Sequence, residues 1–142
     1  MRIQVKKLKP EAKVPSYGHR GDAGGDLYSC IECTILPGEQ AQINTGLVLL
    51  IPQGYVGLIW DKSGIATNHG MHVLAGLIDS TYRGEILVVI KNLGKDAFKV
   101  EKGMKIAQIL IQQIPSITFT EVEALDTTLT RGNNGFGSTG LT

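Results

Sequence analysis

Short apolar runs separated by glycine- or proline-containing turns constrain the fold of this chain more than any other feature. The turns recur about every 8–12 residues, and no apolar period of about 3.6 residues persists over about 11 residues. This spacing is typical of all-β sandwiches and barrels, and it predicts a jelly-roll-like fold. We expect strands around Ile3 and Val5 and at residues 27–36, 40–51, 55–60, 86–90, 98–100, 105–114 and 118–122, with a turn of helix at 65–70.

Length and charge narrow the class of protein. The chain has 142 residues, which suits one domain with a sizeable core. Its 14 Lys and Arg against 13 Asp and Glu leave a net charge of +1, so bulk attraction to nucleic acid or to an anionic membrane is not expected. No apolar run approaches the roughly 20 residues of a transmembrane helix, and the first residues lack the apolar stretch of a signal peptide. We therefore expect a cytoplasmic protein.

The composition changes near the C-terminus. Residues 1–125 contain all the strand patterns, whereas residues 126–142 are rich in glycine and threonine and have almost nothing to bury. Such a tail is normally disordered. Its aromatic residue, Phe136, lies between glycines and follows Arg131, which predicts a flexible arm that becomes ordered on a ligand.

The stretch from Ala75 to Asn92 is the strongest candidate for a catalytic element. Asp79 directly follows Leu77 and Ile78, and a short polar turn then leads into the apolar run 86–90. Two strands joined by a short glycine-containing loop predict a β-hairpin. An acid at the mouth of such a hairpin would be held by rigid backbone on both sides, as a catalytic group requires. The plain alternative is a turn aspartate that hydrogen-bonds its own backbone.

Four further groups suggest a phosphate site. Asp26 begins a predicted strand, Lys62-Ser63-Gly64 presents a cation, a hydroxyl and free backbone N–H groups, and Gln108 is the polar side chain of an apolar run. The segment 131–140 combines a guanidinium with many free amides, a composition suited to phosphate. Singly, these groups could be a turn cap, a solvated turn, a strand-edge residue and a floppy end. Together they predict a triphosphate held with a divalent ion, beside an acid and under a mobile aromatic lid.

The remaining chemical groups have simpler interpretations. Cys30 and Cys33 form a lone C-x-x-C without a second ligand pair, so they are interpreted as half-buried strand thiols. His69 and His72 are expected to be solvated turn residues, and Trp60 is expected in the core.

Five segments, in this order along the chain, resemble the five motifs of the trimeric dUTP diphosphatase (dUTPase) family. They are AGGDLYS at 23–29, DKSGIA at 61–66, AGLIDSTYRGE at 75–85, GMKIAQILI at 103–111 and RGNNGFGSTG at 131–140. The resemblance implies a homotrimer of jelly-roll-like β-clip barrels with shared active sites. It implies Mg²⁺-assisted hydrolysis of dUTP to dUMP and pyrophosphate, which keeps uracil out of DNA and supplies dUMP for thymidylate synthesis.

The resemblance also implies a role for each matching residue. Asp79 corresponds to the general base that activates water for attack on the α-phosphorus, and Tyr82 to the residue that packs on the deoxyribose. Asp26 would support Mg²⁺ through its water shell. Uracil would pair with backbone at Gly76, Leu77, Ile78 and Leu87, phosphate would contact Lys62, Ser63, Gly64 and Gln108, and the arm would supply Arg131, Phe136, Gly137, Ser138 and Thr139.

Three positions depart from the family pattern. Lys62 replaces the usual arginine and loses its bidentate geometry, Thr81 replaces a second acid, and Asn134 replaces a glycine. Two alternatives to a dUTP diphosphatase therefore stay open. The first is a dCTP deaminase or bifunctional relative of the same fold, which the glycine-rich fifth motif disfavours. The second is a non-enzymatic trimeric regulator that responds to nucleotide.

Overall fold

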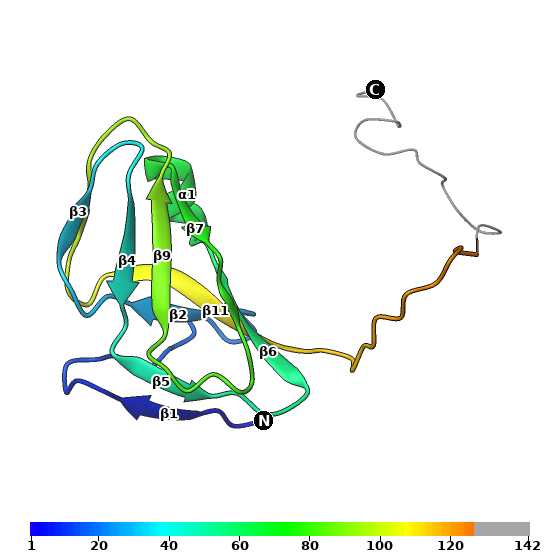
Figure 1. The fold of residues 1–142 in the computed structure, drawn as a ribbon. Coiled ribbons are helices and arrows are strands. Elements are labelled where there is room, and N and C mark those ends of the chain that lie inside the picture. The colour runs from blue at the N-terminus through cyan, green and yellow to red at the C-terminus, as the bar shows by residue number, and fades with distance from the viewer. Residues whose placement is uncertain (127–142) are drawn as a thin grey trace.

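The computed structural model describes residues 1–126, and within them the chain is almost entirely β-structure with one short helix (Figure 1). The elements are β1 (Gln4–Lys7), β2 (Gly25–Tyr28), β3 (Cys33–Ile35), β4 (Gln40–Asn44), β5 (Leu47–Leu50), β6 (Tyr55–Trp60), α1 (Ser63–His69), β7 (Met71–Leu74), β8 (Leu77–Ile78), β9 (Leu87–Asn92), β10 (Phe98–Val100) and β11 (Lys105–Gln113). The predicted all-β, jelly-roll-like fold is confirmed. No helix in residues 1–126 is long and apolar enough to cross a membrane.

The strands form small antiparallel sheets with many crossovers. The largest has the order β2-β11-β6-β8, a second has the order β4-β9-β7, and β1-β5 and β3-β10 are two-stranded ribbons. The sheets surround one apolar core, because strands such as β9 bury alternate residues: Val88, Ile90 and Asn92 are buried while the residues between them are half-exposed. The four-stranded sheet carries most of the predicted site, because it contains Asp26 and Gln108 and leads into the segments with Lys62 and Asp79.

Several predicted elements are confirmed. The strands at 55–60 and 98–100 have the predicted bounds, and the predicted strand at 105–114 ends one residue early, at Gln113. The helical turn expected at 65–70 is present as α1, which begins two residues earlier at Ser63. Two long predicted strands are each divided in two: residues 27–36 by a bend around Cys30, and residues 40–51 at Gly46, whose φ is +69°. These breaks let consecutive strands enter different sheets.

Two predicted elements are wrong. Residues 118–122 form no strand; the chain from 114 onward is exposed and extends away from the body (Figure 1). The expected hairpin within 75–92 is also absent, because β8 pairs with β6 whereas β9 pairs with β4 and β7. The two arms of this loop therefore belong to different sheets, and no strand pairing joins them within the described residues.

Candidate active site

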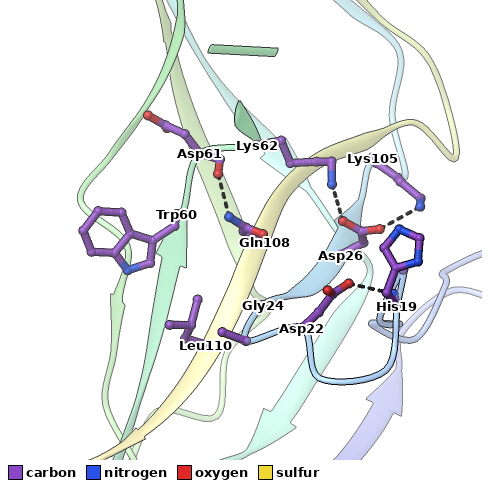
Figure 2. A pocket seen from close by; sticks show the side chains of 12 residues that line it. His19, Asp22, Gly24, Asp26, Trp60, Asp61, Lys62, Lys105, Gln108 and Leu110 are labelled. Carbon is purple, nitrogen blue, oxygen red and sulfur yellow. Dashed lines mark hydrogen bonds and ion pairs between the residues drawn. The ribbon is translucent and has the colours of Figure 1, made fainter. Parts of the chain in front are cut away.

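Charged and amide side chains converge on an open cleft of about 630 Å³ over the four-stranded sheet, here called the Asp26 cleft (Figure 2). Asp26 lies on β2, Gln108 lies opposite it on β11, and Trp60 lies opposite Gln108 on β6. Lys62 and Lys105 approach the same carboxylate from two sides (Figure 2). Three sequence-predicted residues from three distant segments, Asp26, Lys62 and Gln108, thus line one cleft.

Asp26 is held between two ammonium groups. Its Oδ1 is 2.5 Å from Nζ of Lys62 and its Oδ2 is 2.7 Å from Nζ of Lys105, while its side chain is only 7% exposed. Burial raises the pKa of this carboxyl, but the hydrogen bonds and charges of Lys105 and Lys62 together outweigh it and hold the pKa below its usual range. The hydrogen bond to Asp26 raises the pKa of Lys105. The carboxylate of Asp26 and the ammonium group of Lys105 are therefore charged at neutral pH.

Gln108 is fixed by the backbone around it. Its Nε2 donates to the backbone carbonyl of Asp61 at 2.9 Å. A Cβ added at Gly24 would lie 2.8 Å from its Oε1, so only glycine allows β2 and Gln108 to approach this closely. The side chain of Asp61 accepts hydrogen bonds from the backbone N–H of Val73 at 2.6 Å and bonds Nδ1 of His72 at 2.8 Å. Asp61 therefore joins the end of β6 to both β7 and Gln108.

Lys62, Ser63 and Gly64 occupy the turn where β6 leads into α1. Lys62 is the N-cap residue with extended backbone angles and makes no side-chain cap, and Ser63 and Gly64 are exposed at the start of the helix. The first N–H groups of a helix have no partner within the helix. This turn therefore presents an ammonium group, a hydroxyl and free backbone donors beside the Asp26 cleft.

A second cleft of about 420 Å³ shares Trp60 and Asp61 with the first and contains Gly76 and Leu77; it is here called the Gly76 cleft. The backbone carbonyl of Gly76 accepts a hydrogen bond from the N–H of Ile59 at 2.8 Å. Gly76 has φ +101°, and a Cβ there would lie 2.8 Å from the carbonyl oxygen of Ile59. Its neighbour Ala75 has φ +58°, a conformation that costs a non-glycine residue about 1–2 kcal/mol. The backbone entering β8 is thus strained and closely packed, as at many functional sites.

The loop after β8 carries Asp79 and Tyr82 on the surface. The side chain of Asp79 is exposed and has no hydrogen-bond or ion-pair partner in residues 1–126, so it is not the self-bonded turn aspartate of the plain alternative. The hydroxyl of Tyr82 donates to the carbonyl of Glu85 at 2.9 Å, and its ring lies over Gly84. The guanidinium of Arg83 donates to the carbonyls of Ser80 and Tyr82. The loop is therefore compact although its acid is free.

A single chain does not bring Asp79 to the Asp26 cleft. Asp26 is opposite Gln108 on β11, which is in turn opposite Trp60 on β6. Ile78 is opposite Gly57 on β6, so the next residue, Asp79, is at the height of Val56 along that strand. Three strand spacings of about 4.8 Å and four residues of about 3.4 Å separate the two residues, which places their Cα atoms about 20 Å apart. That distance is too long for both groups to act on one phosphorus within one chain.

The arms beside Asp79 leave backbone unpaired. Leu77 and Ile78 pair with β6 on one side only, and Leu87 begins β9 on the other arm opposite Asn44. No ladder joins the two arms in the described residues, so the facing edges of β8 and β9 have no strand partner between them. A buried polar group needs a partner, and a planar base edge can supply several.

Sequence reasoning missed two residues of the site and misplaced a third. Lys105 lies in the fourth family segment, but only Gln108 of that segment was given a role, and a β-bulge decides where Lys105 points. Asp61 is adjacent to the predicted Lys62, but nothing in its sequence context shows that its backbone carbonyl would receive Gln108. Trp60 was expected in the core and is 58% exposed at the junction of the two clefts. The predicted residues Arg131, Phe136, Gly137, Ser138 and Thr139 lie outside the described residues.

The cysteines and histidines do not form a metal site in residues 1–126, where no three His, Cys, Asp or Glu side chains cluster. Cys30 is buried and donates to the carbonyl of Thr45, and Cys33 is half-buried in β3; burial raises the pKa of both thiols. His72 is partly exposed beside Asp61, and His69 lies against Phe98. Cys33 is the half-buried strand thiol that was predicted, whereas Cys30 is fully buried in the bend between β2 and β3.

Asp26 fits Mg²⁺ only through water. A carboxylate has about four acceptor sites, and the two lysines use one on each oxygen, which leaves sites for water-mediated contact. Mg²⁺ usually retains several waters and binds one or two carboxylates together with substrate phosphates. The donor set of the Asp26 cleft therefore suits a hydrated ion that arrives with phosphate and does not form a protein cage.

An all-β fold with two ammonium groups in an open cleft and an exposed carboxylate on a separate loop indicates a protein that binds ligands carrying phosphate. The dUTPase family model matches residues 10–140. The deoxyuridine 5'-triphosphate nucleotidohydrolase of Trichodesmium erythraeum is 48% identical over 142 residues and that of Clostridium novyi is 46% identical over 143, with at least 99% of each chain covered. The chain belongs to the dUTPase family.

Solved structures agree with this assignment. The Staphylococcus bacteriophage 80alpha dUTPase with dUPNHPP has a TM-score of 0.92 and 30% sequence identity, with 99% of each chain covered. A variant of the dUTPase from phage phi11 of S. aureus has a TM-score of 0.82 and 27% identity over 87% of this chain and 98% of that one; it is described as revealing the coordination of a structural Mg(II) ion. The β-clip jelly roll predicted from the motifs is thereby confirmed.

Proposed function

We propose that the protein is a dUTP diphosphatase that hydrolyses dUTP to dUMP and pyrophosphate. The observation that carries the proposal is the convergence of Asp26, Lys62 and Gln108 in one open cleft, in a member of the dUTPase family whose Asp79 carboxylate has no partner in residues 1–126. Two ammonium groups and the donors at the start of α1 suit a triphosphate, because charge-assisted hydrogen bonds to phosphate are the strong ones.

In the proposed reaction Asp79 accepts a proton from a water molecule that attacks the α-phosphorus in line with the departing pyrophosphate. General-base catalysis of this kind contributes about 10²–10⁴-fold, and positioning and charge neutralisation supply most of the rest. Mg²⁺, when bound with the substrate, neutralises phosphate charge, and Asp26 would contact it through water. Lys62, Ser63, Gly64 and Gln108 hold the phosphate chain at the start of α1 and on β11.

Selection of uracil is assigned to the backbone between β8 and β9. Backbone groups of Gly76, Leu77, Ile78 and Leu87 would pair with the base edge. A base with a mismatched donor pattern, such as cytosine, would leave polar groups unpaired, which discriminates strongly. Tyr82 would pack on the deoxyribose and exclude a 2′-hydroxyl.

The site is proposed to be shared between copies of the chain in a homotrimer. Two observations support this. The separation of about 20 Å between Asp79 and Asp26 favours a site in which the acid of one copy meets the cleft of another. On the outer face of the same sheet, Leu77, Leu58 and Leu110 form a lateral row beside Trp60, and Leu77 is 64% exposed. Such a row favours burial against a second copy.

The arm is proposed to close the site, with Arg131 on phosphate, Phe136 over uracil, and Gly137, Ser138 and Thr139 as further phosphate donors. Residues 1–125 would then be the catalytic barrel and 126–142 the arm. Deleting residues 127–142 should reduce turnover strongly while size-exclusion chromatography still shows a trimer. Full activity of the shortened protein would contradict the assignment of the lid.

A nucleotide panel tests the function. Purified protein with Mg²⁺ should release pyrophosphate from dUTP far faster than from dCTP, dTTP or UTP, and chelation of Mg²⁺ should slow it. No pyrophosphate from dUTP would refute the proposal and leave the regulator as the better interpretation. Release of ammonia from dCTP would favour the deaminase instead.

A further inference from the structure

Lys105 is the one cation of the Asp26 cleft without an assigned role. It begins β11, its ammonium group lies 2.7 Å from Oδ2 of Asp26, and its side chain is 49% exposed. Lys62 reaches the other oxygen of the same carboxylate from the opposite side (Figure 2). The cleft therefore holds two ammonium groups around one carboxylate, and Asp22 and Asp61 complete its charged lining.

A β-bulge places Lys105 in the cleft. Along β11, Gln108 pairs with Asp26 and Ala107 with Leu27, but Lys105, not Ile106, pairs with Tyr28. Regular alternation from Gln108 would put Ile106 on the face of Asp26. The bulge instead leaves Ile106 in the core at 2% exposure and turns Lys105 toward the carboxylate. Bulges next to active sites commonly re-aim a side chain in this way.

The pairing with Asp26 leaves most hydrogen-bonding capacity of Lys105 unused. An ammonium group has three donors, and within residues 1–126 Asp26 is the only partner of Lys105 and of Lys62. Their remaining donors border the open cleft. A phosphate group has several acceptor oxygens and negative charge, so it matches two ammonium groups separated by one carboxylate.

We propose that Lys105 is a further triphosphate-binding residue, which with Lys62 forms a two-ammonium clamp on the phosphate chain of the substrate. The second ammonium group strengthens phosphate binding. Lys62 alone binds phosphate less well than an arginine would, because a lysine lacks the bidentate fork of a guanidinium group. Asp26 holds both ammonium groups in place before the substrate enters. The inference rests on the proposed function, since it takes the ligand of the Asp26 cleft to be a deoxynucleoside triphosphate.

The test compares ligands with and without the outer phosphates. Binding of dUpNHpp and of dUMP is measured by calorimetry or competition, with Mg²⁺, for the wild type, Lys105→Met and Lys105→Arg. Lys105→Met should weaken dUpNHpp binding at least about tenfold and leave dUMP binding unchanged within about twofold. Lys105→Arg, which keeps the charge, should restore most of the dUpNHpp affinity.

Lys99→Met is the matched control. Lys99 forms an exposed ion pair with Glu101 at 3.1 Å on a different strand, so its loss removes the same charge and a similar pair outside the cleft. It should change neither affinity. If Lys105→Met does not fold, Lys105→Gln gives the same comparison with a donor retained.

Two outcomes would overturn the inference. Unchanged dUpNHpp affinity in Lys105→Met would mean that Lys105 does not reach the phosphates. An equal loss for dUMP and dUpNHpp would mean that it only supports the fold around Asp26. A wild-type protein that binds neither ligand would instead refute the proposed function, so the two failures are distinguishable.

Discussion

Mixing two inactive variants should restore activity if, as proposed, the acid and the phosphate cleft of each site come from different copies of the chain. Asp79→Asn removes the general base and leaves the cleft intact. Lys62→Met with Ser63→Ala removes two phosphate contacts and leaves the acid intact. Two charge-assisted or hydroxyl contacts are worth about 3 kcal/mol or more together, so the second variant should lose at least about 100-fold in kcat/KM.

The expected recovery follows from the geometry. If the two residues lie about 20 Å apart in one chain, a working site needs the cleft of an Asp79→Asn copy and the acid of a neighbouring double-variant copy. In trimers assembled at random from equal amounts, about one site in four meets that condition. Mixed trimers, which are about three quarters of the random population, each contain one such site in three, so co-expression with two different tags, purification of the mixed trimers and a pyrophosphate assay should give about a third of wild-type turnover. Verified mixed trimers with no more activity than their parents would refute the shared site.

Three further changes test the acid, the buried carboxylate and the strained glycine. Asp79→Asn should lower kcat by about 10²–10⁴-fold while dUpNHpp still binds; loss of both would make Asp79 structural. Because its lysine partners hold the pKa of Asp26 below its usual range despite burial, the ion pairs stabilise the fold above about pH 4, and that stability is lost as pH falls through the folded-state pKa. Acid unfolding of Asp26→Asn, followed by circular dichroism, should therefore depend less on pH than that of the wild type. If the variant and the wild type unfold over the same range of acidic pH, the ion pairs of Asp26 do not stabilise the fold. Gly76→Ala should lower the free energy of unfolding by at least about 1 kcal/mol more than Gly54→Ala, since both have positive φ but only Gly76 would also meet the backbone of Ile59. Equal losses in urea titrations would remove the close contact from the explanation.

Local sequence signals predicted the elements that turns delimit on both sides. β6 lies between the turn after Ile51 and the turn at Asp61, and β10 lies between two glycine turns, so their bounds were readable from the chain. The arms around Asp79 have an equally clear local pattern, yet they pair with other sheets. Pairing depends on the distant partner strands β4 and β6, which a local pattern does not contain.

The sequence predicted the site residues whose chemical type indicates phosphate binding. It did not predict the residues that enter the site only because of how the chain folds. Asp26, Lys62 and Gln108 were identified by type and spacing, and they meet in one cleft. Lys105 could not be identified because a bulge decides which of two neighbouring residues faces Asp26. Trp60 looks like a core residue, but strand alternation places it on the outer face with Gln108.

The predicted strand at 118–122 shows a different limit. Its alternating residues fit a strand, but a strand needs a partner, and residues 1–126 offer none to this segment. Phe119 is 95% exposed and Ile117 is 65% exposed, which would be unfavourable for a chain that functions alone. The segment thus supports assembly with further copies.

Hydrolysis of dUTP in ¹⁸O-labelled water tests most directly whether a carboxylate-activated water attacks the α-phosphorus. Mass spectrometry of the products should find one ¹⁸O atom in dUMP and none in pyrophosphate. Label in pyrophosphate, or in inorganic phosphate released with dUDP, would place the attack on another phosphorus and contradict the assignment of Asp79.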